Sequence, residues 1–124
     1  GTLAMQIPAF AKVGVDLSLF HRGTLNVSIA PHSFKAAKAW KTLPNIRWSP
    51  VMPAENFSFY RCGIRAFGNT TFHRGLVYWP HPSTKPEFHQ DPSILEILAP
   101  YIDGVKYGSE VELELNSEEI AVIG

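Results

Sequence analysis

Two short stretches of the chain carry residue types and spacings that suggest chemistry. Thr24 and Asn26 lie two positions apart in an alternating segment, so both side chains point to one face of a predicted strand. A hydroxyl and an amide carbonyl are neutral hard-oxygen donors, which suit a Mg²⁺ ion that also takes phosphate oxygens. Glu96 lies inside the apolar run 94–99, so its carboxylate must face away from the core, toward solvent or a ligand. The simpler alternatives are that Thr24 and Asn26 only form hydrogen bonds with the backbone at a strand end, and that Glu96 is an outward-facing glutamate.

Other reactive residues form no catalytic motif. The five histidines make no HxH or HExxH pair, so we expect them in loops or at the surface: His21, His32, His73, His81 and His89. A single cysteine, Cys62, excludes an intramolecular disulfide and a thiolate zinc cluster, and its mid-strand position is typical of a small buried hydrophobe. The alternating glutamates of 110–114 predict a solvated strand face rather than a metal site. GxSxG, Walker and GxGxxG motifs do not occur.

Alternating segments predict a mainly β fold that holds these residues. Strands are expected at 23–29, 45–49, 57–67, 71–79, 94–99, 111–115 and 120–123. A hairpin is expected around Gly68-Asn69, and a break of phase near Gly63 suggests a bulge. The proline-rich segment 80–92 has no periodic pattern and predicts a loop of a length that is often functional.

Helical spacing predicts one main helix. Phe34 and Ala37 stand three residues apart among lysines, which favours a helix at about 32–42. A single helical turn is expected at 9–12, after Pro8, because proline is tolerated at the first position of a helix.

Composition limits the class of protein. The 124 residues are 45% hydrophobic and 18% charged, which suits one domain spanning 1–124 with its own core. Eleven basic residues balance eleven acidic residues, and this zero net charge argues against a sequence-independent nucleic-acid binder. No apolar run reaches the length of a membrane helix and no signal peptide is visible, so we expect a soluble cytoplasmic domain without membrane contact.

The order of these motifs resembles a known family. The run GTLNV at 23–27, followed far downstream by ILEILAP at 94–100, is similar to motifs of the archaeal CTP-dependent riboflavin kinase family. Three further pieces fit that family's central hairpin and closing strand: the turn at 68–69, residues 75–77 with Pro80, and 105–111. The resemblance implies a small six-stranded β-barrel of the cradle-loop type. It also implies transfer of a phosphoryl group from CTP to riboflavin, giving FMN.

The resemblance also implies functional residues. Thr24 and Asn26 match the family's Mg²⁺-binding threonine and asparagine, and Glu96 matches the glutamate that contacts the flavin. Thr84 in the proline-rich loop is the best match to a flavin-contacting threonine, with Ser83 as the alternative because the loop is longer here. Mg²⁺ is the implied cofactor, CTP the implied phosphate donor, and riboflavin and FMN the implied ligands. No catalytic side chain is assigned.

Two departures from the family concern the nucleotide. The family has a glycine-rich loop ahead of its GTLN motif, and this chain aligns only to the stretch after that loop, so we expect that segment to be missing. Tyr101 and Ile102, followed by Asp103, replace a basic nucleotide-holding segment, and they are the remaining candidates for a nucleotide contact. Because phosphoryl transfer depends on neutralising phosphate charge, we expect a flavin to bind more readily than CTP.

Three functions therefore stay open. The first is riboflavin kinase-like phosphoryl transfer, and the second is a non-catalytic module that binds a flavin or a nucleotide. The third is a dimeric DNA-binding regulator, since related barrels occur among transcription regulators. Zero net charge and the acidic 110–114 face oppose this third function.

Overall fold

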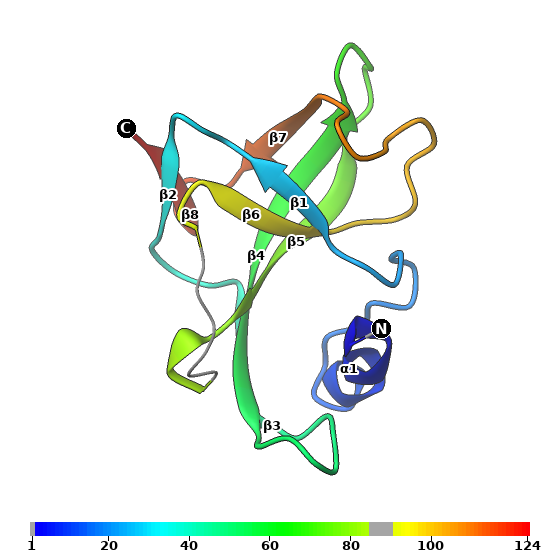
Figure 1. Cartoon of the computed structure of the whole chain (residues 1–124), viewed down its shortest axis with the longest axis vertical. Coiled ribbons are helices and arrows are strands. Elements are labelled where there is room, and N and C mark those ends of the chain that lie inside the picture. Colours follow the sequence, from blue (N-terminus) through cyan, green and yellow to red (C-terminus); the bar gives the residue numbers. More distant parts are fainter. Residues whose placement is uncertain (1, 85–90) are drawn as a thin grey trace.

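The computed structural model of the chain describes residues 2–84 and 91–124, and this described part is mainly β (Figure 1). Its helical elements are α1 (Thr2–Ala11) and a short 3₁₀ turn, η1 (Pro82–Thr84). Its strands are β1 (Leu25–Ser28), β2 (Ser33–Ala36), β3 (Lys41–Ile46), β4 (Glu55–Ala66), β5 (His73–Pro80), β6 (Ile94–Leu98), β7 (Val111–Leu115) and β8 (Ile120–Ile123). The mainly β fold predicted from the sequence is confirmed.

Six of these strands form one antiparallel sheet. Its order is β1-β6-β5-β4-β3. β3 pairs with the first half of β4, and β7 pairs with the second half of β4 along the same edge. β2 and β8 form a separate antiparallel ribbon. The predicted six-stranded barrel is an open sheet and not a closed barrel, because neither β1 nor β7 has a second strand partner within the described residues. Their free edges nevertheless face each other, since Val27 of β1 and Val111 of β7 line the same cavities.

The long strands β4 and β5 confirm the hairpin predicted around Gly68-Asn69. Their register runs without a shift through Gly63, so the predicted bulge there is wrong. The break of phase has another cause, because β4 changes the face that it buries. Phe57 and Phe59 point to the face under α1, whereas Ile64 is buried on the opposite face. A strand of this kind shows two alternating patterns that are out of phase with each other.

The helix predicted at about 32–42 is wrong. That segment instead holds β2 and the start of β3. β2 pairs with β8 and buries Phe34, whose ring meets Trp79 edge-on at a centroid distance of 5.6 Å. Lys41 and Thr42 begin β3, which pairs with β4, so the strand predicted at 45–49 begins earlier and ends earlier. Pairing with strands distant in the sequence therefore overrides the helical spacing.

α1 is the main helix, where the sequence predicted only one turn at 9–12. Its buried residues are Leu3, Gln6 and Phe10, which recur at helical spacing, although Pro8 inside the helix obscures this pattern. Among the residues that the structure describes, none forms a helix of the length and hydrophobicity that crossing a bilayer requires.

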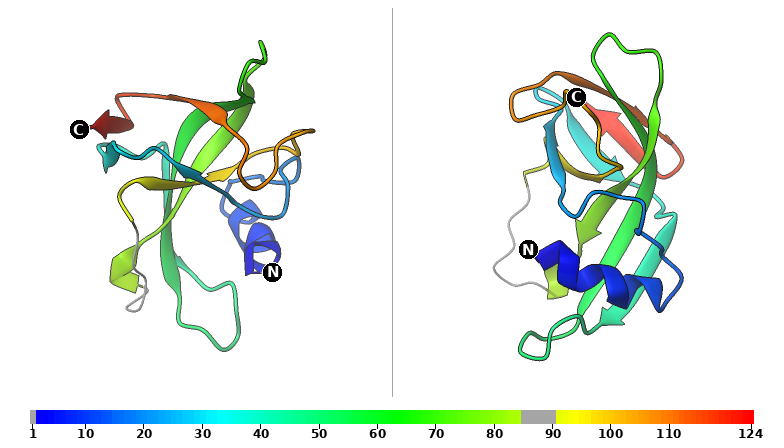
Figure 2. Two further views of the ribbon diagram at one scale, coloured as in Figure 1. Left: turned by 45° about the horizontal axis from the view of Figure 1, so that its top comes forward. Right: turned by 90° about the vertical axis from the view of Figure 1, so that its right-hand side faces the viewer.

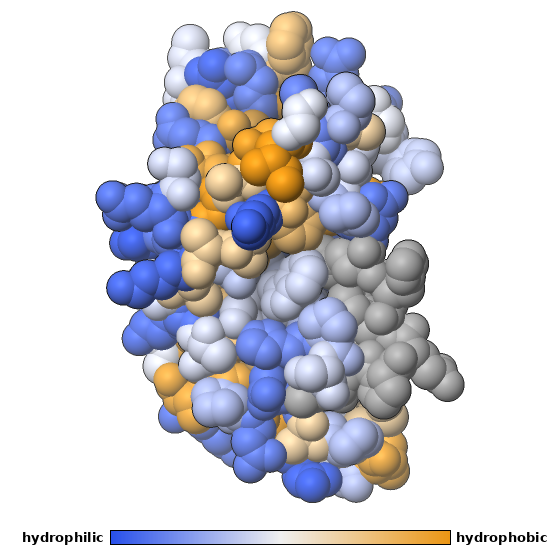
Figure 3. All heavy atoms as spheres, turned by 90° about the vertical axis from the view of Figure 1, so that its left-hand side faces the viewer, coloured by the Kyte–Doolittle hydropathy of each residue, from blue (hydrophilic) through white to orange (hydrophobic). Residues whose placement is uncertain are grey.

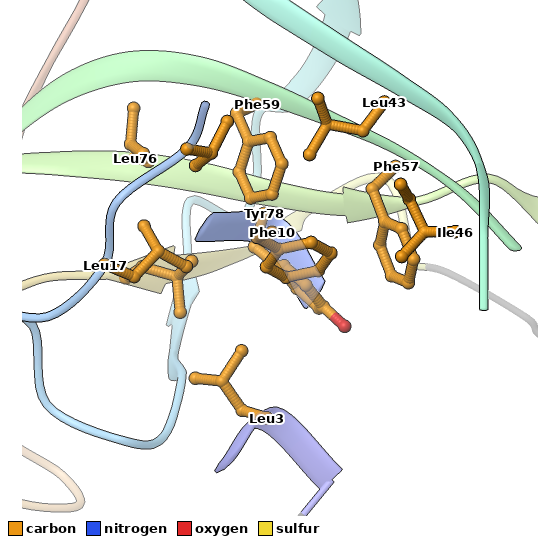
Figure 4. Close-up of a cluster of buried hydrophobic side chains, with 11 residues drawn as sticks. Leu3, Phe10, Leu17, Leu43, Ile46, Phe57, Phe59, Leu76 and Tyr78 are labelled. Carbon is orange, nitrogen blue, oxygen red and sulfur yellow. The ribbon is translucent and has the colours of Figure 1, made fainter. Parts of the chain in front are cut away.

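α1 covers one face of the sheet, and the residues between them form the first core cluster (Figure 4). The Phe10 ring meets the rings of Phe57 and Phe59 edge-on, with centroids 4.9 and 5.3 Å away. Side chains from β3, β5 and β6 complete this cluster: Leu43, Ile46, Leu76, Tyr78 and Leu98. This face of the sheet is closed to solvent.

The opposite face of the sheet carries the second core cluster, which includes residues of the β2–β8 ribbon. Its fully buried members are Ile64, Val77, Leu95, Ile97 and Ile120. The side chains of β1 and β7 that point to this core stay only partly buried: Leu25, Val27, Val111, Leu113 and Leu115. Figure 2 shows α1 and the β2–β8 ribbon toward opposite ends of the molecule. The second core is therefore open on the side where β1 and β7 do not pair.

Candidate functional site

The gap between β1 and β7 contains a cleft of about 790 Å³. β1 with Thr24 forms one wall and the segment 105–112 another, and Ile64 and Phe67 complete the lining. Pockets that hold small molecules have volumes of about 300–1,000 Å³, so the cleft has the size of a ligand site.

The wall formed by β1 carries two of the residues that the sequence singled out. Thr24 and Asn26 both line the cleft, Thr24 half-buried and Asn26 exposed. The register of β1 and β6 puts Asn26 opposite Glu96, and the Thr24 hydroxyl donates to the Glu96 carboxylate with an Oγ1–Oε1 distance of 3.3 Å. Glu96 does not itself line the cleft but lies beside it on β6. The structure thus brings these three predicted residues together.

Acidic groups outnumber basic groups along the cleft. Lys106 is the basic side chain among the described residues that line it, whereas Glu110 and Glu112 are acidic. Glu112 is paired with Arg65 at 3.1 Å, and hydrogen bonds from this guanidinium lower the pKa of Glu112. A polyphosphate would meet a single cation here, so the charges favour a neutral ligand or an anion that arrives with a divalent metal.

Two exposed aromatic side chains line the cleft and were missed from the sequence. Phe67 is 68% exposed, and Tyr107 is fully exposed. Each precedes a glycine with positive φ, Gly68 at +88° and Gly108 at +90°. A residue beside such a turn glycine stands at the surface, and this was the available signal. Exposed rings of this kind can stack on a planar ligand.

The structure does not bring the predicted flavin contact Ser83 to the cleft. Ser83 is exposed on η1 and is not among the described residues that line the cleft. Thr84 ends η1, and its side chain lies outside the described residues, as does the rest of the loop at 85–90. The flavin role of this loop stays a prediction.

The predicted nucleotide residues Tyr101 and Ile102 border the cleft and differ in burial. Ile102 is buried in the second core cluster, whereas Tyr101 is 72% exposed. Both line a small cavity of about 100 Å³, which shares Leu25 and Val105 with the cleft. Tyr101 is therefore the side chain of this pair that a ligand can reach.

The remaining reactive residues have structural surroundings. Burial raises the pKa of the Cys62 thiol to about 12, which keeps it protonated and unreactive. Ser58 Oγ and His81 Nε2 lie 2.6 Å apart, but Ser58 is buried, so this pair is an internal hydrogen bond rather than an accessible nucleophile and base. In the part of the chain that the structure describes, no three His, Cys, Asp or Glu side chains gather as metal ligands. Glu110 and Glu114 are exposed, as predicted for a solvated strand face.

The cleft combines apolar walls, two neutral oxygen donors and two exposed aromatic rings. Comparisons with known proteins give no match, whether to a family model, a curated protein or a solved structure. The residues of the cleft are therefore the basis for proposing a function.

Proposed function

We propose that the chain is a riboflavin kinase-like protein that binds riboflavin or FMN in the cleft between β1 and the segment 105–112. The observation that carries this proposal is that Thr24 and Asn26 line one cleft with Phe67 and Tyr107. A flavin has a planar ring system and a polar ribityl chain, so it needs apolar and aromatic contacts together with oxygen or amide contacts. The lining of the cleft offers both kinds of contact.

The proposal includes the cradle-loop barrel that the resemblance implies. A barrel of this kind, opened along one line, would leave two strands facing each other across a gap. β1 and β7 face each other in this way, and we call the gap between them the seam. The gap between β1 and β7 is then the entrance to the ligand site.

The resemblance also implies Mg²⁺, and the donor set of the cleft fits this ion. Thr24 and Asn26 would hold it through neutral oxygens, and the hydrogen bond from Thr24 keeps the Glu96 carboxylate beside them. Bound Mg²⁺ would neutralise part of the charge of a phosphate-bearing ligand. An anionic ligand would depend on this neutralisation, because the described residues that line the cleft include one lysine and two glutamates.

Phosphoryl transfer from CTP is the second candidate function, favoured by the same Thr24–Asn26 pair. In this reaction the ribityl hydroxyl oxygen bonds to the γ-phosphorus while the bond from that phosphorus to the β–γ bridging oxygen breaks. The hydroxyl proton is released, and the products are FMN and CDP. A chain that binds riboflavin and forms no FMN is instead the non-catalytic module.

A fluorescence titration with riboflavin tests flavin binding. We expect saturable quenching of riboflavin emission as protein is added. Tyr107→Ala should weaken the affinity about three- to tenfold, because it removes one stacking ring. Leu19→Ala is the control, since Leu19 is 86% exposed and lines neither the cleft nor the small cavity beside it, and it should change the affinity less than about twofold. Unsaturable quenching, or an equal loss in both variants, would overturn the proposal.

Calorimetry with CTP and Mg²⁺, together with chromatographic detection of FMN, tests the second candidate. We expect CTP to bind more weakly than riboflavin, because Glu110 and Glu112 oppose a triphosphate along the cleft. FMN production that is lost in Asn26→Ala would support the kinase activity. Tight CTP binding without flavin binding would contradict a flavin site and point to a nucleotide-binding module.

A further inference from the structure

The free edges of β1 and β7 also border a second cavity, of about 470 Å³. This cavity shares Val27, Ser28 and Val111 with the cleft but continues along β7 to the ribbon strand β8. Its other lining residues are mostly apolar: Ile29, Leu113, Leu115, Ser117, Ile120, Ala121 and Val122. Apart from the three shared residues, this cavity lies next to the proposed flavin site and has its own lining.

Val122 shows that this cavity is an uncovered part of the second core. Phe34 and Val122 are directly paired in the ribbon, and Ile120 lies two positions away, so all three side chains share one face. Phe34 and Ile120 are buried, whereas Val122 is 50% exposed. Figure 3 shows apolar surface gathered on the side of the molecule that carries β2 and β8, with hydrophilic residues around it. Apolar surface beside an unpaired strand edge is the arrangement that accepts an added strand.

The other face of β7 carries acidic side chains, which determine the kind of strand that can pair with its free edge. Glu110, Glu112 and Glu114 alternate with aliphatic residues, and they lie on the face away from the second core. Of the three, only Glu112 has an ion pair in the described residues, with Arg65 of β4. A strand added to the free edge of β7 would set its outward side chains directly beside these glutamates. Basic side chains at those positions would stabilise the pairing, and acidic ones would oppose it.

We propose that the free edge of β7 binds an extended peptide segment of a partner protein in which aliphatic and basic residues alternate. The aliphatic side chains enter the cavity beside Leu113 and Val122, and the basic side chains pair with the glutamates. The backbone of the peptide satisfies the free edge of β7. A second copy of this chain does not fit this description, because no two Lys or Arg residues of the sequence stand two positions apart.

Fluorescence anisotropy with a short labelled peptide of alternating valine and lysine tests this proposal. The control peptide has the same composition, with the valines and the lysines in separate blocks, so the charge is equal and the alternation is lost. We expect the alternating peptide to bind about tenfold more tightly than the block peptide. On peptide binding, hydrogen exchange of the β7 amides should slow.

A pair of charge variants locates the binding site. Glu114→Lys should weaken the alternating peptide about fivefold or more, since it places like charges opposite each other. Glu118→Lys makes the same change of charge at an exposed glutamate outside the strand, and it should alter the affinity less than about twofold. Riboflavin affinity should be unchanged in Glu114→Lys, because Glu114 does not line the cleft, so failure here leaves the flavin proposal standing.

Two outcomes would overturn the peptide site. Equal affinities for the two peptides, or equal losses in the two charge variants, would mean nonspecific attraction between opposite charges. A dimer in sedimentation velocity that Glu114→Lys dissociates would assign the edge of β7 to a second copy of the chain.

Discussion

The two faces of the same sheet are completed in different ways. On one face α1 seals the first core cluster, and Phe10, Phe57 and Phe59 are fully buried. On the other face the inward side chains of β1 and β7 stay partly buried, and two cavities open between these strands. The covered face contributes stability through buried aromatic area, whereas the open seam leaves surface for a ligand. The candidate site therefore lies where the inward side chains of β1 and β7 are only partly packed.

Removing the aromatic anchor of the covered face should have the largest effect. Phe10→Ala leaves a cavity against Phe57 and Phe59 and should lower the free energy of unfolding by about 3–5 kcal/mol. Urea denaturation followed by tryptophan fluorescence measures this change. Met5→Ala in the same helix, where the side chain is 51% exposed, is the control and should cost about 0.5 kcal/mol or less. Equal losses would show that α1 does not stabilise this face by packing.

A glycine on the second-core face should give the next largest effect. A Cβ atom at Gly75 would lie 2.8 Å from the carbonyl oxygen of Leu98, so Gly75→Ala must push β5 and β6 apart. We expect a loss of about 1–3 kcal/mol in the free energy of unfolding. At Gly63 the nearest atom is Cδ1 of Phe72, 3.3 Å away on a side chain that can move, so Gly63→Ala should lose less. Wild-type stability of Gly75→Ala in thermal denaturation would contradict the close approach of these strands.

A smaller loss should follow when the covered face loses one buried hydrogen bond. The Tyr78 hydroxyl donates to Oε1 of the buried Gln6 at 2.6 Å. Tyr78→Phe should cost about 1–2 kcal/mol, because the Gln6 carbonyl is left without this donor. Adding Gln6→Met should restore part of the loss by removing the other partner as well.

The ionisation of the same tyrosine gives a second check. Burial raises the pKa of Tyr78 above its ordinary value, so an absorbance titration should show that this phenol ionises only when the protein unfolds. Ionisation of all tyrosines in the ordinary range while the protein stays folded would show that the covered face admits water.

The smallest effect on stability is expected in the cleft. Asn26 is exposed and Thr24 makes one long hydrogen bond, so Asn26→Ala and Thr24→Ala should each change the free energy of unfolding by about 0.5 kcal/mol or less. Their effect should appear instead in the affinity for Mg²⁺ with a phosphate-bearing ligand, measured by calorimetry. A stability loss as large as that of Tyr78→Phe would mean that these residues hold the fold, and the contrast between the two faces would fail.

Local signals in the sequence were enough for most of the strands. β1, β6, β7 and β8 alternate or run apolar between turn residues, and the hairpin between β4 and β5 follows from its glycine and asparagine. That Thr24 and Asn26 share one strand face also follows from the two-residue period of a strand, although Leu25 and Val27 between and beside them line the cleft as well. These features depend on neighbours in the sequence, which is why they could be predicted.

Other features depend on contacts between distant segments. Phe34 lies in a strand because β2 pairs with β8, far along the chain, and because the second core buries its ring. The residue spacing within 32–42 does not indicate this pairing. α1 was predicted as a single turn because its buried side chains acquire a core only once β3, β4 and β5 are assembled beneath it.

The sequence by itself therefore determined the alternation of the strands, the central turn and the oxygen donors on β1. Tertiary structure alone decided that β1 and β7 face each other without pairing, and that Phe67 and Tyr107 reach the same cleft as Thr24. The reason is physical: alternation specifies which way a side chain points from its strand, but the curvature of the whole sheet sets what stands opposite.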